Sequence, residues 1–237
     1  MNSPPTRMPK NRPLTTVKKD ALPPITTRNI RLAHAASSAA IRSRLAEFSD
    51  ILANGDDLRF WEEMVFCFFT GGCSAKMGLR SIEKVRHLLE KGTQEELVNA
   101  LSGTHRYPNA RSRYIVASRE FLLKDCDLRL RSRLMAFSDP IERRDWLVQE
   151  KGIKGLGYKE ASHFLRNVGF RGYAILDKHV LNCLAALKII PEAKPPNTRL
   201  RYLTIEESLK KLARRTKIDF DELDLVLWSM KTGEILK

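Results

Sequence analysis

The stretch that decides the fold reads Gly152-Ile153-Lys154-Gly155-Leu156-Gly157 and runs on as Tyr158-Lys159-Glu160-Ala161-Ser162-His163-Phe164-Leu165-Arg166-Asn167-Val168. One predicted helix ends near Lys151, and Gly169 ends the helix that follows the glycines. Glycine at alternate positions lets backbone N–H groups approach an anion, because a side chain would clash or could not adopt a positive φ. The positive N-terminal end of the second helix points to the same place. The pattern predicts a phosphate-binding helical hairpin at about residues 140–168; a plain turn between two helices, which also favours glycine, is the alternative.

Working outward from the hairpin, apolar residues recur at three- and four-residue spacing through most of the chain from about residue 30, which indicates amphipathic helices. The segments with this pattern are 30–53, 58–70, 76–91, 93–102, 108–124, 140–151, 158–168, 178–187, 204–216 and 221–231. We find neither a convincing run of alternating strand residues nor an internal repeat. The sequence therefore predicts an all-α fold.

Residues 1–28 have a different composition from the rest of the chain. They contain six of the 11 prolines, several lysines and arginines, and no apolar periodicity. This composition predicts a basic, Pro-rich disordered tail, followed by a helical domain over residues 29–237. The tail could add sequence-independent attraction to phosphates, or it could be a simple extension.

The overall charge is strongly positive. Lys and Arg number 42 against 28 Asp and Glu, which gives a net charge of +14 and favours a polyanionic partner, with DNA and RNA ahead of anionic lipid. No apolar run approaches the ~20 residues that span a bilayer, so we expect a soluble, intracellular protein, in the cytoplasm or nucleoid of a prokaryote. The four cysteines form no C-x-x-C pair, which predicts reduced thiols and no metal site.

Two polar residues near the hairpin are candidates for chemistry. The predicted buried face of the second hairpin helix consists of Ala161, Phe164, Leu165 and Val168. Lys159 lies nearly opposite, beside His163 and Arg166, and is expected to project toward solvent or toward whatever the hairpin binds. Taken alone, such a lysine is usually a surface charge, and Asp177, which precedes the next predicted helix, is usually an N-cap. Their joint position beside a phosphate-binding hairpin favours a functional pair.

The run from Lys154 to Asn167, followed by Ala174-Ile175-Leu176-Asp177-Lys178-His179, resembles the helix-hairpin-helix DNA glycosylases. More narrowly, it is similar to the type-2 8-oxoguanine DNA glycosylases of archaea and some bacteria. In that superfamily a lysine in the second hairpin helix and an aspartate 18 positions later carry catalysis, and Lys159 and Asp177 have this spacing. The resemblance covers about residues 35–237 and implies two helical lobes with the active-site cleft between them.

Two distant segments extend the resemblance to the base pocket. His105-Arg106-Tyr107 resembles the family's segment with an aromatic residue beside the flipped base, and the end of the chain, Leu223 to Lys237, resembles the family's C-terminus. The resemblance implies that Tyr107, Trp228 and the terminal Lys237 form the base pocket. Tyr107 stands where the family has Phe, and Gly71-Gly72-Cys73 is an unusual variant of an early turn. The absence of a C-terminal four-cysteine cluster argues against the iron–sulfur branches.

The resemblance also implies an activity. It predicts a base-excision repair enzyme without a cofactor that acts as a monomer on double-stranded DNA containing oxidised guanine. The enzyme would flip out 8-oxoguanine and excise it, with Asp177 stabilising the oxocarbenium-like sugar, and would cleave the abasic strand by β-elimination through a Lys159 Schiff base. Lys154, Gly155 and Gly157 would hold a DNA phosphate. Two alternatives stay open: a non-catalytic helix-hairpin-helix DNA-binding protein, and a glycosylase of this fold with another lesion preference.

Overall fold

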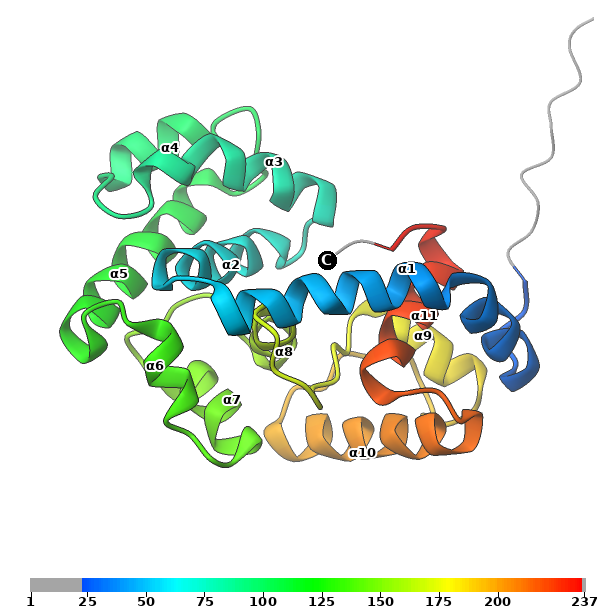
Figure 1. Ribbon diagram of the computed structural model, residues 1–237. Coiled ribbons are helices and arrows are strands. Elements are labelled where there is room, and N and C mark those ends of the chain that lie inside the picture. Colours follow the sequence, from blue (N-terminus) through cyan, green and yellow to red (C-terminus); the bar gives the residue numbers. More distant parts are fainter. Residues whose placement is uncertain (1–22, 236–237) are drawn as a thin grey trace, which may run out of the picture.

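The computed structural model describes residues 23–235, and within them all regular structure is helical (Figure 1). The helices are α1 (Thr27–Asn54), α2 (Asp57–Thr70), α3 (Ala75–Val85), the 3₁₀ turn η1 (Arg86–Leu88), α4 (Gln94–Leu101), α5 (Pro108–Cys126), α6 (Leu130–Met135), α7 (Pro140–Gln149), α8 (Tyr158–Asn167), α9 (Lys178–Ala186), α10 (Arg199–Thr216) and α11 (Phe220–Thr232). The predicted all-α fold is confirmed. None of the described helices is long and apolar enough to cross a membrane.

The helix boundaries differ from the sequence expectation by more than three residues in three places. The segment predicted as one helix over 76–91 is divided into α3, which ends at Val85, and the 3₁₀ turn η1. Helix α6 was not expected, because its six residues make fewer than two turns, too few for a periodic pattern. Helix α10 begins at Arg199 rather than near residue 204, since the Thr198 side chain caps it by accepting a hydrogen bond from the Arg201 N–H. Residues 1–22 of the predicted tail lie outside the described residues.

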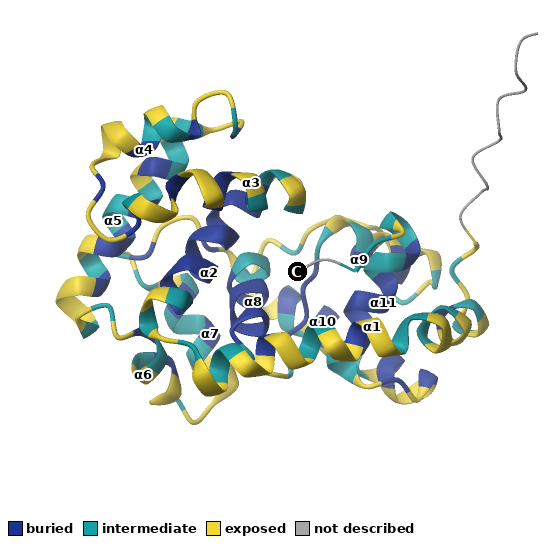
Figure 2. Cartoon of the chain, turned by 45° about the horizontal axis from the view of Figure 1, so that its top comes forward, coloured by how far each residue is buried: buried dark blue, intermediate teal, exposed yellow. Residues whose placement is uncertain are grey.

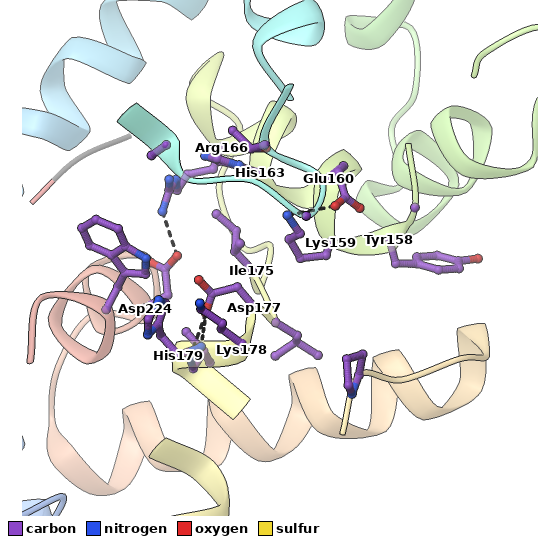
Figure 3. Close-up of a pocket in the computed structure, with 18 of the residues that line it drawn as sticks. Tyr158, Lys159, Glu160, His163, Arg166, Ile175, Asp177, Lys178, His179 and Asp224 are labelled. Carbon is purple, nitrogen blue, oxygen red and sulfur yellow. Dashed lines mark hydrogen bonds and ion pairs between the residues drawn. The ribbon is translucent and has the colours of Figure 1, made fainter. Parts of the chain in front are cut away.

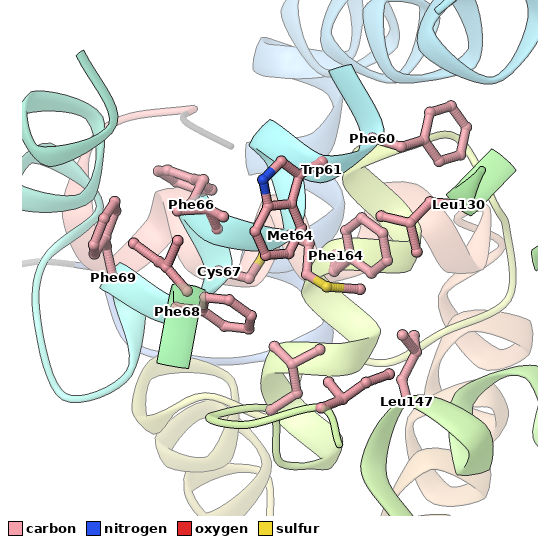
Figure 4. Packing of buried hydrophobic residues seen from close by; sticks show 14 of the residues in the cluster. Phe60, Trp61, Met64, Phe66, Cys67, Phe68, Phe69, Leu130, Leu147 and Phe164 are labelled. Carbon is pink, nitrogen blue, oxygen red and sulfur yellow. The ribbon is translucent and has the colours of Figure 1, made fainter. Parts of the chain in front are cut away.

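The first lobe is built around α2. This helix is apolar on nearly all sides and is buried from Phe60 to Thr70, as expected for a helix that passes through the middle of a core. Figure 4 shows its aromatic side chains packed with Leu130, Leu147 and Phe164. The Trp61 indole donates a hydrogen bond to the Leu89 carbonyl at 3.0 Å, so the largest buried ring is also satisfied as a donor.

The second lobe combines the two ends of the chain. Ile30 and Ile41 of α1 share a hydrophobic core with residues of α9, α10 and α11. Helix α1 also reaches the first lobe, where Ile51 and Leu52 near its end pack against the first core. As Figure 1 shows, α1 therefore lies along both lobes and joins them.

Helix α8 lies between the lobes, and this position corrects the expectation of an open polar face on it. All residues from Ala161 to Asn167 are buried, and Figure 2 shows this stretch as a dark helix at the centre of the molecule. His163 and Arg166 are each only 7% exposed, but they line the same cleft between the lobes as Lys159, so the predicted shared side faces a cleft and not open solvent. The reason is that the second lobe covers the face of α8 that the first lobe leaves open.

A buried ion pair also links the lobes. Arg144 of α7 and Glu206 of α10 are 1% and 4% exposed, and Arg144 Nη1 lies 2.6 Å from Glu206 Oε2. Glu206 accepts a further hydrogen bond from the Ala174 N–H, and Arg144 Nη1 donates to Ser162 Oγ of α8. Because the pair is enclosed, removing one partner leaves an uncompensated buried charge.

We predict that Glu206→Ala lowers the free energy of unfolding by about 3 kcal/mol or more, because the Arg144 guanidinium stays buried without its carboxylate. The matched control is Glu207→Ala on the same helix, where Glu207 pairs with Arg214 on the surface. That variant should lose far less, because a solvated surface ion pair contributes little to stability. Urea unfolding at pH 7 measures both values, and equal losses for the two variants would contradict this account.

Candidate functional site

The hairpin predicted from the glycines is present between α7 and α8. Asp139 caps α7, since its carboxylate accepts a hydrogen bond from the Ile141 N–H at 2.8 Å. Gly155 has a φ of +79°, and a Cβ there would lie 2.4 Å from the Tyr114 ring, so only glycine fits. No described residue accepts a hydrogen bond from the backbone N–H of Gly155 or Gly157, and both residues are exposed.

The backbone N–H of Lys154, unlike those of Gly155 and Gly157, has a hydrogen-bond partner in the protein. Its N–H donates to Ser118 Oγ of α5 at 2.9 Å, which fixes the hairpin loop to the first lobe, while the residue itself is exposed. The free N–H groups of Gly155 and Gly157, the side chain of Lys154 and the N-terminal end of α8 together can bind an anion from solvent. This geometry supports the predicted phosphate site, with the Lys154 backbone excluded from it.

A cleft of about 1110 Å³ lies between the two lobes. Its walls come from the turn between α2 and α3, the first half of α8, residues 175–180, residues 195–197 and one side of α11. Lys159, Asp177 and Trp228, three of the residues predicted from the sequence, line this cleft. Figure 3 shows Lys159 and Asp177 on facing walls, one on α8 and the other just before α9.

Lys159 has a different charged partner from the one expected. Its Nζ lies 2.9 Å from Glu160 Oε1, and the two side chains are 25% and 17% exposed. Among the described residues, Glu160 is the carboxylate that forms an ion pair with this amine, and no ion pair joins Lys159 to Asp177. The predicted catalytic pair is thus brought to one cleft without being in contact.

Asp177 combines the two roles considered for it. Its Oδ1 accepts hydrogen bonds from the N–H groups of His179 and Val180, each at 2.8 Å, so it is the N-cap of α9. Its other oxygen accepts no hydrogen bond from a described residue and lies on a residue that lines the cleft. The cap fixes the carboxylate, and the second oxygen is available to a positive charge in the cleft.

Of the two predicted base-pocket residues that the structure describes, one lines the cleft and the other does not. Trp228 lines the cleft, with its ring edge-on to His179 at a centroid distance of 6.3 Å. Tyr107, at the start of α5 in the first lobe, is 41% exposed and does not line the cleft. The guanidinium groups of Arg106 and Arg111 lie 5.3 and 5.6 Å from its ring centre. Lys237 lies outside the described residues.

Asp224 is a cleft residue that the sequence reasoning missed. It is 5% exposed and lies one helical turn before Trp228 on α11. Its Oδ2 accepts a hydrogen bond from Arg166 Nη1 at 2.8 Å, and its Oδ1 has no hydrogen-bond partner among the described residues. Burial raises the pKa of Asp224 to about 6, in spite of the opposing Arg166 charge. A carboxylate in an otherwise apolar helical run, four residues before a tryptophan, is the signal that could have found it.

These groups together define what the cleft can do. A lysine amine can form a covalent bond with an electrophilic carbon, and a fixed carboxylate opposite can stabilise positive charge that develops there. An aromatic ring on the wall of the cleft can stack against a planar ring. The hairpin beside the cleft can bind an anion. The combination suits a nucleic acid with one base turned into the cleft.

Comparisons with known proteins agree with this geometry. A sequence model of the family described as 8-oxoguanine DNA glycosylase matches residues 41–218. The 8-oxoguanine DNA glycosylase/AP lyase of Korarchaeum cryptofilum is 41% identical over 198 residues, which cover 83% of this chain and 90% of that protein. The protein of the same description from Fusobacterium nucleatum is 38% identical over 203 residues, covering 84% and 92% of the two chains.

Solved structures give the same result. The structure of the Methanocaldococcus jannaschii 8-oxoguanine glycosylase/lyase in complex with a 15mer DNA containing 8-oxoguanine matches with a TM-score of 0.81 and 32% identity, covering 89% of this chain and 99% of that one. The 8-oxoguanine DNA glycosylase of Thermotoga maritima matches with a TM-score of 0.79 and 32% identity, covering 89% and 98%. The similarity therefore extends over both lobes and the cleft.

We predict that the contribution of Asp224 to the free energy of unfolding rises as the pH falls, whereas that of an ordinary ion-paired aspartate decreases. Its folded pKa of about 6 lies above the ~3.9 of an unfolded aspartate, so the folded state takes up a proton first as the pH falls. Between pH 7 and pH 4 the wild-type protein should gain about 2 kcal/mol of unfolding free energy relative to Asp224→Asn. Urea unfolding of both proteins at several pH values measures this difference. A difference that shrinks as the pH falls would show an ordinary ion-paired aspartate instead.

Proposed function

The chain belongs to the 8-oxoguanine DNA glycosylase family, and we propose that it excises 8-oxoguanine from double-stranded DNA and cleaves the abasic strand through a Schiff base on Lys159. The observation that carries the proposal is the position of Lys159. It stands in the first turn of the second hairpin helix, it lines the cleft, and Asp177 faces it from the opposite wall (Figure 3). This position supports the proposal, because a strand held at the hairpin would present a sugar to the amine.

DNA engagement follows from the hairpin and the cleft. A base inside a duplex is unreachable, so the enzyme must turn it out of the stack. The N–H groups of Gly155 and Gly157 and the Lys154 side chain hold a backbone phosphate beside the cleft, and the flipped nucleoside enters it. A cleft of about 1110 Å³ is large enough for a nucleoside. The net charge of +14 adds sequence-independent attraction to the duplex.

The chemistry uses Asp177 and Lys159 in turn. As the glycosidic bond breaks, the sugar becomes oxocarbenium-like, and the free oxygen of Asp177 stabilises that charge. The Lys159 amine attacks C1′, the sugar ring opens, and a Schiff base forms between Nζ and C1′. Loss of a C2′ proton then expels the 3′ phosphate by β-elimination, which cleaves the strand.

The base pocket is proposed around α11. Trp228 provides a stacking surface, and Asp224, one helical turn before it, holds Arg166 beside the cleft. Tyr107 and Lys237 stay predicted pocket residues, the former as a second aromatic contact and the latter through the resemblance of the C-terminal segment. We propose that the protein works as a monomer on DNA in the cytoplasm or nucleoid.

Two rivals lead to different experimental results. In a non-catalytic DNA-binding protein, Lys159 would be a phosphate contact and nothing more. In a glycosylase with another lesion preference, the chemistry would be the same, but a different base would be released. The overall match to relatives described as 8-oxoguanine DNA glycosylase/AP lyase favours excision of oxidised guanine over both alternative functions.

We predict that borohydride traps the wild-type protein on a duplex with one 8-oxoguanine and does not trap it on the undamaged duplex. Lys159→Gln and Lys159→Arg should both give no adduct, while Lys159→Arg keeps the charge and the DNA affinity. Denaturing gel electrophoresis of the labelled duplex measures the adduct, and release of the base is followed in parallel. Binding without trapping or base release would favour the non-catalytic rival, and release of a different lesion from a substrate panel would favour the second.

We also predict that Asp177→Asn slows base release by about 100-fold or more, because the charge opposite the sugar is lost. Its thermal stability should change little, since Asn is an equally good N-cap for α9. Asp177→Ala should show the same loss of rate and an additional loss of about 1 kcal/mol of stability. Single-turnover base release and urea unfolding measure the two effects. An Asp177→Asn variant with the wild-type rate would remove Asp177 from the mechanism.

A further inference from the structure

Glu160, the residue after Lys159, carries the carboxylate that contacts the proposed nucleophile. Its Oε1 lies 2.9 Å from Lys159 Nζ, within hydrogen-bond distance, and its side chain is only 17% exposed at the wall of the cleft (Figure 3). Consecutive helical residues do not usually face each other. This contact is formed in the first turn of α8, where both side chains turn into the same cleft.

The surroundings hold the Glu160 carboxylate in place. A Cβ on Gly71, in the turn after α2, would lie 3.5 Å from Oε1, and a Cβ on Gly157 would lie 3.3 Å from Oε2. The carboxylate therefore fits against two backbones that carry no side chain. Arg111 of α5 also reaches this place: its Nη2 lies 3.3 Å from the same Gly71 position and donates to the Gly71 carbonyl. Glu160 is thus a packed group with defined neighbours, not a solvated surface charge.

The other candidate for a proton acceptor is less well placed. Asp177 forms no ion pair with Lys159, and its Oδ1 accepts the two N–H groups that it caps. The charged groups around Glu160 are Lys159 on its own helix and Arg111 from α5, with Asp177 and Lys178 on the facing wall. An amine must lose a proton before it can attack, and a general base must be within hydrogen-bond reach of that proton. Glu160 meets this condition.

We propose that Glu160 is a catalytic residue that takes a proton from the Lys159 ammonium and later returns it to O4′ of the sugar. This inference rests on the proposed function. One N–H bond of the ammonium breaks, the electron pair stays on Nζ, and the proton moves to Glu160. The Nζ lone pair forms the bond to C1′, while the bond from C1′ to the base breaks and leaves its electron pair on the base.

Two further proton transfers complete the reaction. A second proton leaves Nζ for the departing base, which restores the Nζ lone pair. That pair forms the second bond of the imine as the C1′–O4′ bond breaks with its electrons on O4′. The proton held by Glu160 moves to O4′, which becomes a hydroxyl group. Glu160 ends the sequence as a carboxylate, and the product is a protonated imine between Lys159 and C1′. Asp177 takes no proton in these steps and only stabilises the positive charge of the sugar.

A purely electrostatic role for Glu160 makes the opposite prediction. A carboxylate that only neutralises the ammonium favours the charged form of the lysine, so its removal would leave the amine as reactive or more reactive. Removal of a proton acceptor, in contrast, slows the reaction, because hydroxide must then take the proton from the ammonium. The sign of the change in rate therefore separates the two roles.

The test is single-turnover base release and borohydride trapping on the 8-oxoguanine duplex, with enzyme in excess so that changes in DNA affinity do not contribute. We expect Glu160→Gln to slow both by about 100-fold at pH 7, the lower end of the effect of general acid–base groups. Its rate should rise about tenfold per pH unit between pH 7 and 9, more steeply than that of the wild type. Glu160→Ala should be slow as well and should be partly restored by added formate but not by chloride.

The matched control is Glu95→Gln, which removes an exposed glutamate from the first turn of α4 and so the same charge at a helix N-terminus. It should keep the wild-type rate. Thermal unfolding and binding to the undamaged duplex show whether the Glu160 variants are folded. A Glu160→Gln variant as fast as, or faster than, an active wild type would overturn the inference alone. A wild type that releases no base and forms no adduct would overturn the proposed function and the inference with it.

Discussion

The enclosure of α8 between two hydrophobic cores is the constraint on which the rest of the structure depends. A helix buried on all sides must satisfy its polar side chains inside the protein. Arg166 therefore pairs with Asp224 of α11, and Asn167 donates to Glu63 of α2 at 3.2 Å. These contacts fix α8 to both lobes. Its buried half is immobilised in this way, and its first turn, with Lys159, emerges at the cleft in a defined place.

Two glycines make this position of α8 possible. At the start, Gly155 allows the hairpin loop to lie against the Tyr114 ring. At the end, Gly169 has a φ of +93°, and a Cβ there would lie 2.5 Å from the Phe48 carbonyl of α1. A larger residue at either point would push the helix away from its neighbours. Gly155, which the hairpin needs for an anion, thus also allows the packing that places the amine.

Three of the carboxylates that line the cleft differ in environment, and their chemistry follows from that difference. Asp177 is held by the backbone of α9 and keeps one oxygen for a positive charge. Asp224 is buried beside Arg166, so its pKa is raised to about 6, and one oxygen lacks a partner. Glu160 contacts the amine itself. In the proposed mechanism these environments make Asp177 the charge stabiliser and Glu160 the proton acceptor, whereas Asp224 holds Arg166 in place.

The sequence by itself determined the features that depend on neighbours along the chain. Apolar spacing predicted most of the helices, and alternate glycines predicted the hairpin. The resemblance to the helix-hairpin-helix DNA glycosylases implied the pair Lys159 and Asp177, which face each other in the cleft. Only the tertiary structure decided which groups touch. It buried His163 and Arg166, paired Lys159 with Glu160, brought Asp224 into the cleft and kept Tyr107 outside it. Most of these outcomes depend on residues far apart in the sequence, such as Arg166 and Asp224, 58 positions apart. Local periodicity describes the faces of one helix, whereas the second lobe, which covers the remaining face of α8, is assembled from both ends of the chain.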